Sequence, residues 1–78
     1  MAERADVVVV GGGYIGLEMA ETYVRLGATV TIVDQAPEIM GTLDPDMAAL
    51  VRTAMVRHGI EVRCGTAVAA FEPGAVHL

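Results

Sequence analysis

Glycines at fixed spacing near the start of the chain could hold a phosphate without any basic side chain. Gly11, Gly13 and Gly16 form the pattern G-x-G-x-x-G within the segment GGGYIG. Gly11 would permit a tight turn, Gly13 would let the backbone approach a diphosphate, and Gly16 would let a helix pack closely on a strand. A helix that begins at this turn would present free N–H groups and the positive end of its dipole to the diphosphate. The segment therefore predicts a turn that binds a dinucleotide.

An acidic residue, Asp34, lies where a second contact to such a ligand is expected. It ends a β-branched run, Thr29 to Val33, and follows Gly16 by eighteen residues. A carboxylate at this position can accept hydrogen bonds from both ribose hydroxyls of an adenosine, and its charge would repel a 2′-phosphate. No Arg or Lys occurs between Arg25 and Arg52 to neutralise such a phosphate. The pattern favours NAD over NADP.

The glycine turn lies between a strand and a helix in the predicted secondary structure. Val7 to Val10 is a β-branched run typical of strands that are covered on both faces. A helix should follow from Tyr14 to Leu26, with Gly27 just after its end, and then a second strand from Thr29 to Val33. Strand, helix and strand in this order form the βαβ unit in which this motif binds dinucleotides. The alternatives are a glycine turn without a ligand and an acid that only ends a strand.

Both predicted helices have an apolar stripe at helical spacing. In the first helix the stripe consists of Ile15, Met19, Tyr23 and Leu26. The second helix begins at Asp44-Pro45-Asp46, which offers an N-cap and a proline at the first helical position, and ends before Gly59. Its stripe consists of Met47, Leu50, Val51, Ala54 and Met55. We expect both stripes, with the methionines Met19, Met47 and Met55, to fill the core.

The remaining elements complete an α/β fold. Strands are expected at Ile60 to Arg63 and Val68 to Phe71, then a turn at Glu72-Pro73-Gly74 and a last strand from Ala75 to Leu78. The predicted fold is a Rossmann-like βαβαβ dinucleotide-binding unit in three layers, with parallel strand order 3-2-1 and Val7 to Val10 central. A short antiparallel β element follows at its C-terminal end.

The amino-acid composition limits the kinds of molecule that the chain is expected to bind. Five Arg, no Lys and ten acidic residues give a net charge of −5, so the positive surface that binds nucleic-acid phosphates is missing. No apolar run approaches the roughly 20 residues that span a bilayer. The single cysteine, Cys64, can form no internal disulfide, which favours the cytoplasm. We expect a protein that binds neither nucleic acid nor membranes.

No metal site or redox centre is expected in the sequence. Cys64 has no partner cysteine and no activating base beside it, so its role should be structural. His58 and His77 have no neighbour of metal-ligand type at a useful spacing. The chain therefore contains no complete catalytic set.

Together these motifs resemble the NAD(P)-binding domain of the pyridine nucleotide-disulfide oxidoreductases. The resemblance runs from about Ala5 to Phe71. It rests on Gly11 to Glu18, Val30 to Asp34, the loop containing Pro37, Leu43-Asp44-Pro45 and Gly59-Ile60-Glu61-Val62. The chain is most similar to the branch that contains coenzyme A disulfide reductases and NADH oxidases, and dihydrolipoamide dehydrogenases look nearly as close.

The resemblance implies that residues 1–78 are the NAD-binding domain of a larger flavoprotein with two dinucleotide sites. The domain would bind NADH in preference to NADPH and position its nicotinamide for hydride transfer to a flavin. FAD would be bound outside this chain, by a flavin domain that also carries the family's redox-active cysteine, and the parent would be a homodimer. The chain would thus belong to an NAD(P)H-dependent FAD oxidoreductase and be inactive alone.

The family also implies roles for residues around the glycine turn. The glutamate after the turn lies near the nicotinamide and the flavin, which implies this role for Glu18, while Tyr14 and Ile15 would cover the diphosphate and nicotinamide side. From the residues alone, the helix dipole accounts for Glu18 equally well, and helix packing accounts for Ile15. The candidate cofactor contacts are Gly11, Gly12, Gly13, Tyr14, Ile15, Gly16, Glu18, Asp34 and Gln35.

Two other functions fit the same motifs. The chain could be the FAD-binding half of a flavoprotein, since that half uses the same glycine pattern and acid and often lies near an N-terminus. It could also be a stand-alone dinucleotide-binding module that acts through a partner without catalysis. Glu18 and the segment from Pro37 to Met47 favour the NAD-binding domain over the FAD-binding half.

Overall fold

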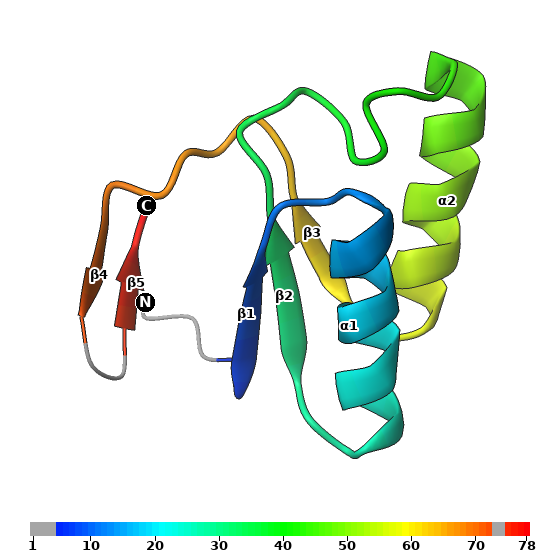
Figure 1. Ribbon diagram of the computed structural model, residues 1–78. Coiled ribbons are helices and arrows are strands. Elements are labelled where there is room, and N and C mark those ends of the chain that lie inside the picture. The colour runs from blue at the N-terminus through cyan, green and yellow to red at the C-terminus, as the bar shows by residue number, and fades with distance from the viewer. Residues whose placement is uncertain (1–4, 73–74) are drawn as a thin grey trace.

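The structure, a computed structural model, describes residues 5–72 and 75–78. Its elements in chain order are β1 (Val7–Val10), α1 (Tyr14–Arg25), β2 (Val30–Val33), α2 (Pro45–Arg57), β3 (Glu61–Arg63), β4 (Ala70–Glu72) and β5 (Ala75–His77) (Figure 1). The predicted α/β unit, Rossmann-like βαβαβ followed by an antiparallel pair, is confirmed. The strand expected from Val68 begins only at Ala70. Pro73 and Gly74 of the predicted turn lie outside the described residues.

A parallel three-stranded sheet forms the middle of the molecule. Its order is β1-β2-β3, so β2 is central and β1 is an edge strand. Val7 pairs with Val30 and Thr31 pairs with Glu61. The predicted central place of Val7 to Val10 is wrong for this chain, because no further strand pairs with β1 among the residues that the structure describes.

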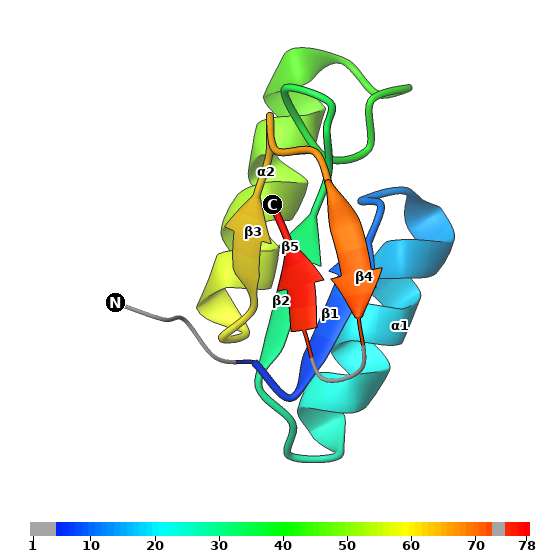
Figure 2. The ribbon, with the colours of Figure 1, turned by 90° about the vertical axis from the view of Figure 1, so that its left-hand side faces the viewer.

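The sheet lies between two different layers. Figure 1 shows α1 and α2 on one side of the sheet and the β4-β5 hairpin on the other. In Figure 2 the hairpin lies in front of the sheet, with both helices behind it. The two hairpin strands are antiparallel, with Ala70 opposite His77. No helix in the described ranges is long and apolar enough to cross a membrane.

The core fills the space between the sheet and the two helices. Ile32, in the central strand, is completely buried, and so are Ala20 of α1 and Ile39 of the loop before α2. Val30, Leu17, Met55 and Ile60 complete the buried cluster. Burying a side chain of the size of isoleucine stabilises a fold by about 1.5–3 kcal/mol, so this cluster holds helices, sheet and loop together.

The helix faces in the core differ from the predicted stripes. Helix α1 packs through Leu17, Ala20 and the partly buried Tyr23 and Val24. Of the predicted stripe only Tyr23 contacts the core, whereas Ile15, Met19 and Leu26 are exposed. Helix α2 buries Ala48 and Met55, with Val51 partly buried, whereas Met47 and Leu50 are exposed. The predicted core role is therefore confirmed for Met55 and wrong for Met19 and Met47. Each helix has apolar residues on two faces, and the face with the small alanine approaches the sheet.

Strand β1 also differs from its expected environment. Its burial alternates along the strand, and Val8 and Val10 are 37% and 52% exposed. The run of four valines was expected to be covered on both faces. Only the face of Val7 and Val9 packs against the core cluster.

Both helices end as the sequence predicts. The N–H of Ala28 donates to the carbonyl of Tyr23, and the N–H of Ile60 donates to the carbonyl of Met55, each at 3.1 Å. These six-to-one hydrogen bonds place Gly27 and Gly59 just after the last helical turn, as in a Schellman motif. At the other end of α2, Asp44 is the N-cap residue, but its side chain makes no capping hydrogen bond.

Candidate functional site

The chain passes from β1 into α1 through the glycine turn at Gly11-Gly12-Gly13. The N–H of Gly11 donates to the carbonyl of Val33 at 2.7 Å and so extends the contact between β1 and β2. Gly11 has a φ of +106°, a conformation that residues with a side chain rarely adopt. The tight turn expected at Gly11 is therefore present.

The second and third motif glycines differ in what surrounds them. A Cβ on Gly16 would collide with the carbonyl oxygen of Gly11, so a side chain here would force the turn or the helix to shift. A Cβ on Gly13 would meet no atom within 4 Å. Space is thus open above Gly13, where α1 begins without a side-chain cap and the first-turn N–H groups have no intrahelical acceptor.

Gly12, between these glycines, is enclosed by the loop that follows β2. Its N–H donates to Oδ2 of Asp34 at 2.7 Å, and its carbonyl accepts from the N–H of Met40 at 2.8 Å. A Cβ on Gly12 would lie 2.5 Å from Cγ2 of Ile39. The sequence motif leaves this position free, so its dependence on the loop could not be found from the motif.

Asp34 is held rigidly at the carboxyl end of β2. Besides its bond to Gly12, its Oδ1 accepts from the N–H of Ala36 at 2.9 Å. Its own N–H donates to the carbonyl of Arg63, and its carbonyl accepts from the N–H of Thr66, both at 3.0 Å. Each carboxylate oxygen retains a lone pair, so Asp34 can still accept from a ligand.

A cleft of about 310 Å³ opens beside Asp34, at the carboxyl ends of the parallel strands. This is the place where open α/β sheets bind their ligands. The lining residues are Val10, Gly11, Val33, Asp34, Gln35, Thr66 and Val68. Thr66 and Val68 were not among the candidate contacts. They could have been found, because residues that follow β3 must lie at the same sheet edge as Asp34.

A second depression, of about 330 Å³, lies between α1 and α2 and contains Tyr14 and Glu18. A hydrogen bond to the Glu18 carboxylate, and then the negative charge of that carboxylate, raise the pKa of the Tyr14 hydroxyl. The Tyr14 hydroxyl therefore stays protonated and donates to Glu18. Met40, Val51 and Met55 form apolar parts of the same wall.

The predicted contacts thus fall into three places. Gly11, Asp34 and Gln35 line the cleft, and Tyr14 and Glu18 line the depression between the helices. Gly12 and Gly16 lie within the turn, while Gly13 and Ile15 are exposed on it. The structure brings all nine residues to the glycine turn and its two sides.

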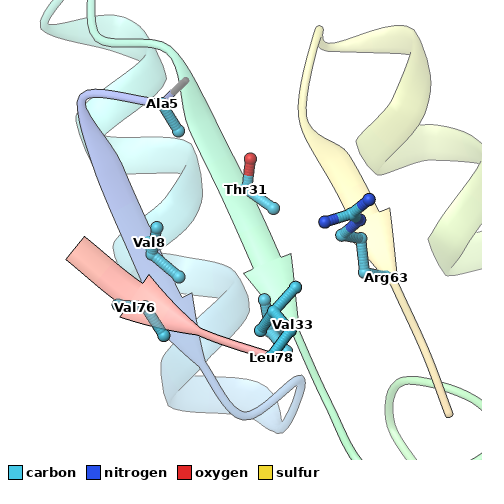
Figure 3. A pocket seen from close by; sticks show the side chains of 7 residues that line it. All are labelled: Ala5, Val8, Thr31, Val33, Arg63, Val76 and Leu78. Atoms are coloured by element: carbon cyan, nitrogen blue, oxygen red, sulfur yellow. The ribbon is translucent and has the colours of Figure 1, made fainter. Parts of the chain in front are cut away.

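A smaller cavity of about 90 Å³ lies between the hairpin and the sheet, away from the glycine turn. Figure 3 shows Val8, Val33, Val76 and Leu78 around this space, with Thr31 and Arg63 farther along the sheet. Sites for small molecules usually have volumes of roughly 300–1,000 Å³. This cavity is too small for a nucleotide.

Cys64 lies just after β3, in a partly buried position. Burial, and next the negative charge of Glu38, raise the pKa of its thiol, which is the opposite of what a reactive cysteine needs. Its Sγ lies 3.8 Å from Oε1 of Glu38. In the described ranges, no group of three His, Cys, Asp or Glu side chains could hold a metal ion.

Comparison with known proteins gives relatives of one kind. The chain is 42% identical over 66 residues to a dihydrolipoyl dehydrogenase of Thermus scotoductus, a match that covers 85% of this chain and 14% of the relative. It is 32% identical to the water-forming NADH oxidase from Lactobacillus brevis bound to NADH, with a TM-score of 0.79, covering 88% of this chain and 16% of that one.

An engineered form of that oxidase, a water-forming NADPH oxidase bound to NADPH, also matches. It has 28% identity and a TM-score of 0.83, with 95% of this chain and 18% of that chain covered. Its five substitutions replace a glycine and, eighteen residues later, an aspartate, both by alanine, and introduce two arginines. The chain therefore spans less than a fifth of the length of each of these relatives.

The family assignment covers nearly the whole chain. Residues 6–77 match the family "Pyridine nucleotide-disulphide oxidoreductase". The resemblance drawn from the motifs is confirmed, and both the NADH oxidases and the dihydrolipoamide dehydrogenases are among the matches. This chain belongs to the pyridine nucleotide-disulphide oxidoreductase family.

Proposed function

We propose that residues 1–78 form the NAD-binding domain of an FAD-dependent pyridine nucleotide oxidoreductase. In this proposal NADH lies across the glycine turn, with its adenosine in the cleft beside Asp34 and its nicotinamide toward Tyr14 and Glu18. The observation that carries the proposal is the Asp34 carboxylate, fixed by the N–H of Gly12 at 2.7 Å beside an open helix N-terminus.

The turn has the properties that a diphosphate needs. Space above Gly13 is open, so a phosphate can approach the backbone there. The first-turn N–H groups of α1 supply hydrogen-bond donors, and the helix dipole supplies positive potential. No basic side chain is required, in agreement with a chain that has only five Arg and no Lys.

The cleft favours NADH over NADPH. Asp34 offers its remaining lone pairs to ribose hydroxyls and repels a 2′-phosphate, and no Arg belongs to the cleft lining. The engineered NADPH oxidase supports this direction, because it lost an aspartate and gained arginines. Its substituted glycine and aspartate are eighteen residues apart, as Gly16 and Asp34 are here.

The nicotinamide would lie on the other side of the turn. There Tyr14 and Glu18 lie close together at the start of α1, where the Glu18 carboxylate raises the pKa of the Tyr14 hydroxyl. Ile15, which is 75% exposed at the turn, offers an apolar surface next to them. These residues would orient the nicotinamide ring, and none of them can itself accept a hydride.

The electron acceptor belongs to the rest of the parent protein. A bound FAD would accept the hydride there, in a flavin domain that is the partner of this chain. The share of the relatives that the chain covers, 14–18%, supports a parent with further domains. We also propose that the parent is a cytoplasmic homodimer.

The test is to titrate NADH and NADPH into wild type and Asp34→Asn by calorimetry. Wild type should bind NADH more tightly, and Asp34→Asn should shrink the ratio of the two affinities, because the charge that repels a 2′-phosphate is gone. Asp46→Asn is the matched control, since Asp46 is an exposed acid in the first turn of α2 and does not line the cleft. Equal affinities of wild type for both nucleotides would refute the preference.

The same titrations test the two alternatives. The FAD-binding half of a flavoprotein would bind FAD more tightly than NADH and would be yellow when purified. Glu18 and the segment from Pro37 to Met47 are the features that favour the NAD-binding domain. A stand-alone sensor would bind NADH but would give no turnover when a flavin domain is added.

A further inference from the structure

A loop packs against the glycine turn and shapes it. Of the candidate cofactor contacts, Gln35 alone belongs to this loop. This loop, residues 35–43, holds Gly12 on two sides. Met40 donates to the Gly12 carbonyl at 2.8 Å, and Ile39, which is completely buried, fills the space that a Cβ on Gly12 would take. The position of Gly12 therefore depends on the position of Ile39 and Met40.

The loop is itself anchored at Glu38. Oε1 of Glu38 accepts from the N–H of Ile39 at 3.1 Å and from Nε of Arg52 at 3.0 Å. The thiol of Cys64 lies 3.8 Å from the same oxygen. Arg52 belongs to α2 and Cys64 follows β3, so one carboxylate oxygen ties the loop to two other elements. We call Glu38, Arg52 and Cys64 the Glu38 latch.

The pair of Glu38 and Arg52 differs from two other ion pairs, Glu21–Arg25 and Glu61–Arg63. The Glu38 side chain is 25% exposed, less than any partner in those two pairs, and its bond to Arg52 is shorter than either of them. The pair between Glu21 and Arg25, by contrast, lies within one exposed helix at 3.5 Å. None of the three latch residues lines the cleft beside Asp34.

We propose that Glu38 and Arg52 are positioning residues for dinucleotide binding, acting through Ile39 and Met40 on Gly12. This proposal rests on the proposed function. The latch holds the loop against the turn, so that the free N–H groups at the start of α1 point at the diphosphate before it arrives. If the turn is correctly placed in only a fraction of the molecules, the apparent affinity for NADH is the intrinsic affinity multiplied by that fraction.

The first experiment measures the NADH dissociation constant of latch variants in the full chain. Glu38→Ala removes both hydrogen bonds and Arg52→Ala removes one, so affinity should fall about 3- to 10-fold in the first and less in the second. Glu38→Gln keeps an oxygen acceptor for Ile39 but loses the charge that holds Arg52, so its affinity should fall about as far as that of Arg52→Ala. Arg25→Ala, which breaks the exposed pair on α1, should leave NADH affinity unchanged.

Coupling between the variants tests whether they act together. If Glu38 and Arg52 position the turn through one contact, the double variant should lose little more affinity than Glu38→Ala alone. Additive losses would overturn the latch as a unit. Circular dichroism and urea unfolding establish that the variants are folded. If Glu38→Ala does not fold, Glu38→Gln and Arg52→Ala carry the test.

The second experiment measures the reactivity of Cys64, which would not respond to NADH if the latch had only a structural role. Binding linkage requires that, if the latch favours NADH, bound NADH favours the closed latch. Saturating NADH should therefore slow the reaction of Cys64 with iodoacetamide in wild type. Glu38→Gln should lose this protection. The protection is read as the ratio of the rates with and without NADH, because loss of the Glu38 charge alone lowers the pKa of the thiol and speeds the reaction. Gly13→Val, expected not to bind NADH, should also show no protection.

The outcomes separate the two proposals. No NADH binding by wild type would overturn the proposed function and this inference with it. NADH binding by wild type with unchanged affinity in every latch variant would overturn the positioning role alone. Protection of Cys64 that persists in Glu38→Gln would mean that NADH shields the thiol directly, which would also refute the latch.

Discussion

The same added methyl group should destabilise the fold at Gly12 and leave its stability nearly unchanged at Gly13. In Gly12→Ala the new Cβ would lie 2.5 Å from Cγ2 and 2.9 Å from Cβ of Ile39. Ile39 is completely buried and branched at the contact, so it cannot turn aside. In Gly13→Ala the new Cβ meets nothing within 4 Å, and the backbone, with φ −79° and ψ −178°, suits any residue.

The magnitudes follow from these surroundings. Overpacking a filled core costs about 1–3 kcal/mol, and this range is expected for Gly12→Ala. Gly13→Ala should change stability by less than about 0.5 kcal/mol, as unconstrained surface substitutions do. For a domain of this size 1 kcal/mol corresponds to a shift in Tm of roughly 4–8 °C. Urea unfolding followed by circular dichroism distinguishes the two variants.

NADH titration of the same proteins separates fold from ligand binding. Gly13→Val should remain folded but lose NADH binding, because its methyl groups occupy the space open to the diphosphate. Equal stability of Gly12→Ala and Gly13→Ala would refute the packing argument. A folded Gly13→Val with wild-type affinity would refute the placement of the diphosphate.

Three further predictions rest on other parts of the structure. Glu18→Gln should lower the pKa of Tyr14 toward its ordinary value of 10.0, since both the hydrogen bond to the carboxylate and its charge favour the protonated phenol; ultraviolet titration of wild type and variant measures this. Ile39→Ala should cost about 2–5 kcal/mol in urea unfolding, because a fully buried side chain is lost, whereas Arg25→Ala should cost less than about 1 kcal/mol. The isolated chain should not oxidise NADH with oxygen as acceptor, and turnover should appear only with the flavin-bearing remainder of the parent; absorbance of NADH measures both.

The elements near the glycine turn could be predicted from the sequence because local chemistry determines them. Gly11 adopts a positive φ, and a side chain on Gly16 would force the turn or α1 to shift. The valine run and the second β-branched run could only be strands at this spacing, and Asp34 follows the second one. Parallel pairing then brings Asp34 to the glycine turn. The position of the candidate site therefore follows from the motif itself.

The helix faces could not be predicted from spacing, because more than one apolar stripe exists on each helix. In α1 the pattern of Ile15, Met19 and Leu26 is as regular as that of Leu17, Ala20 and Val24. Packing chose the second set, since small residues allow a helix to approach a sheet closely. Periodicity reports amphipathicity and cannot rank two stripes of similar apolarity.

The contacts of the loop of residues 35–43 also could not be predicted from the sequence. Its proline and glycine indicate a loop, and a loop is expected to lie on the surface. Ile39 is nevertheless completely buried, and Met40 adopts a φ of 51° while donating to Gly12. The contacts of Ile39 and Met40 with Gly12 join residues at most 28 positions apart in sequence, yet no local sequence pattern encodes these contacts. They form only once β2 and the glycine turn are side by side.

Asp34 shows how ligand binding and folding share one side chain at this site. The sequence assigns Asp34 to the ribose, while the structure gives it bonds to the N–H groups of Gly12 and Ala36. Removing the carboxylate would therefore change nucleotide preference and also release the glycine turn. Asp34→Ala combines both effects, so weaker NADH binding in that variant would say little about the ribose. Asp34→Asn keeps an oxygen for one of the two N–H groups and removes the charge, which makes the ratio of NADH to NADPH affinity, rather than either affinity alone, the quantity that reports on recognition.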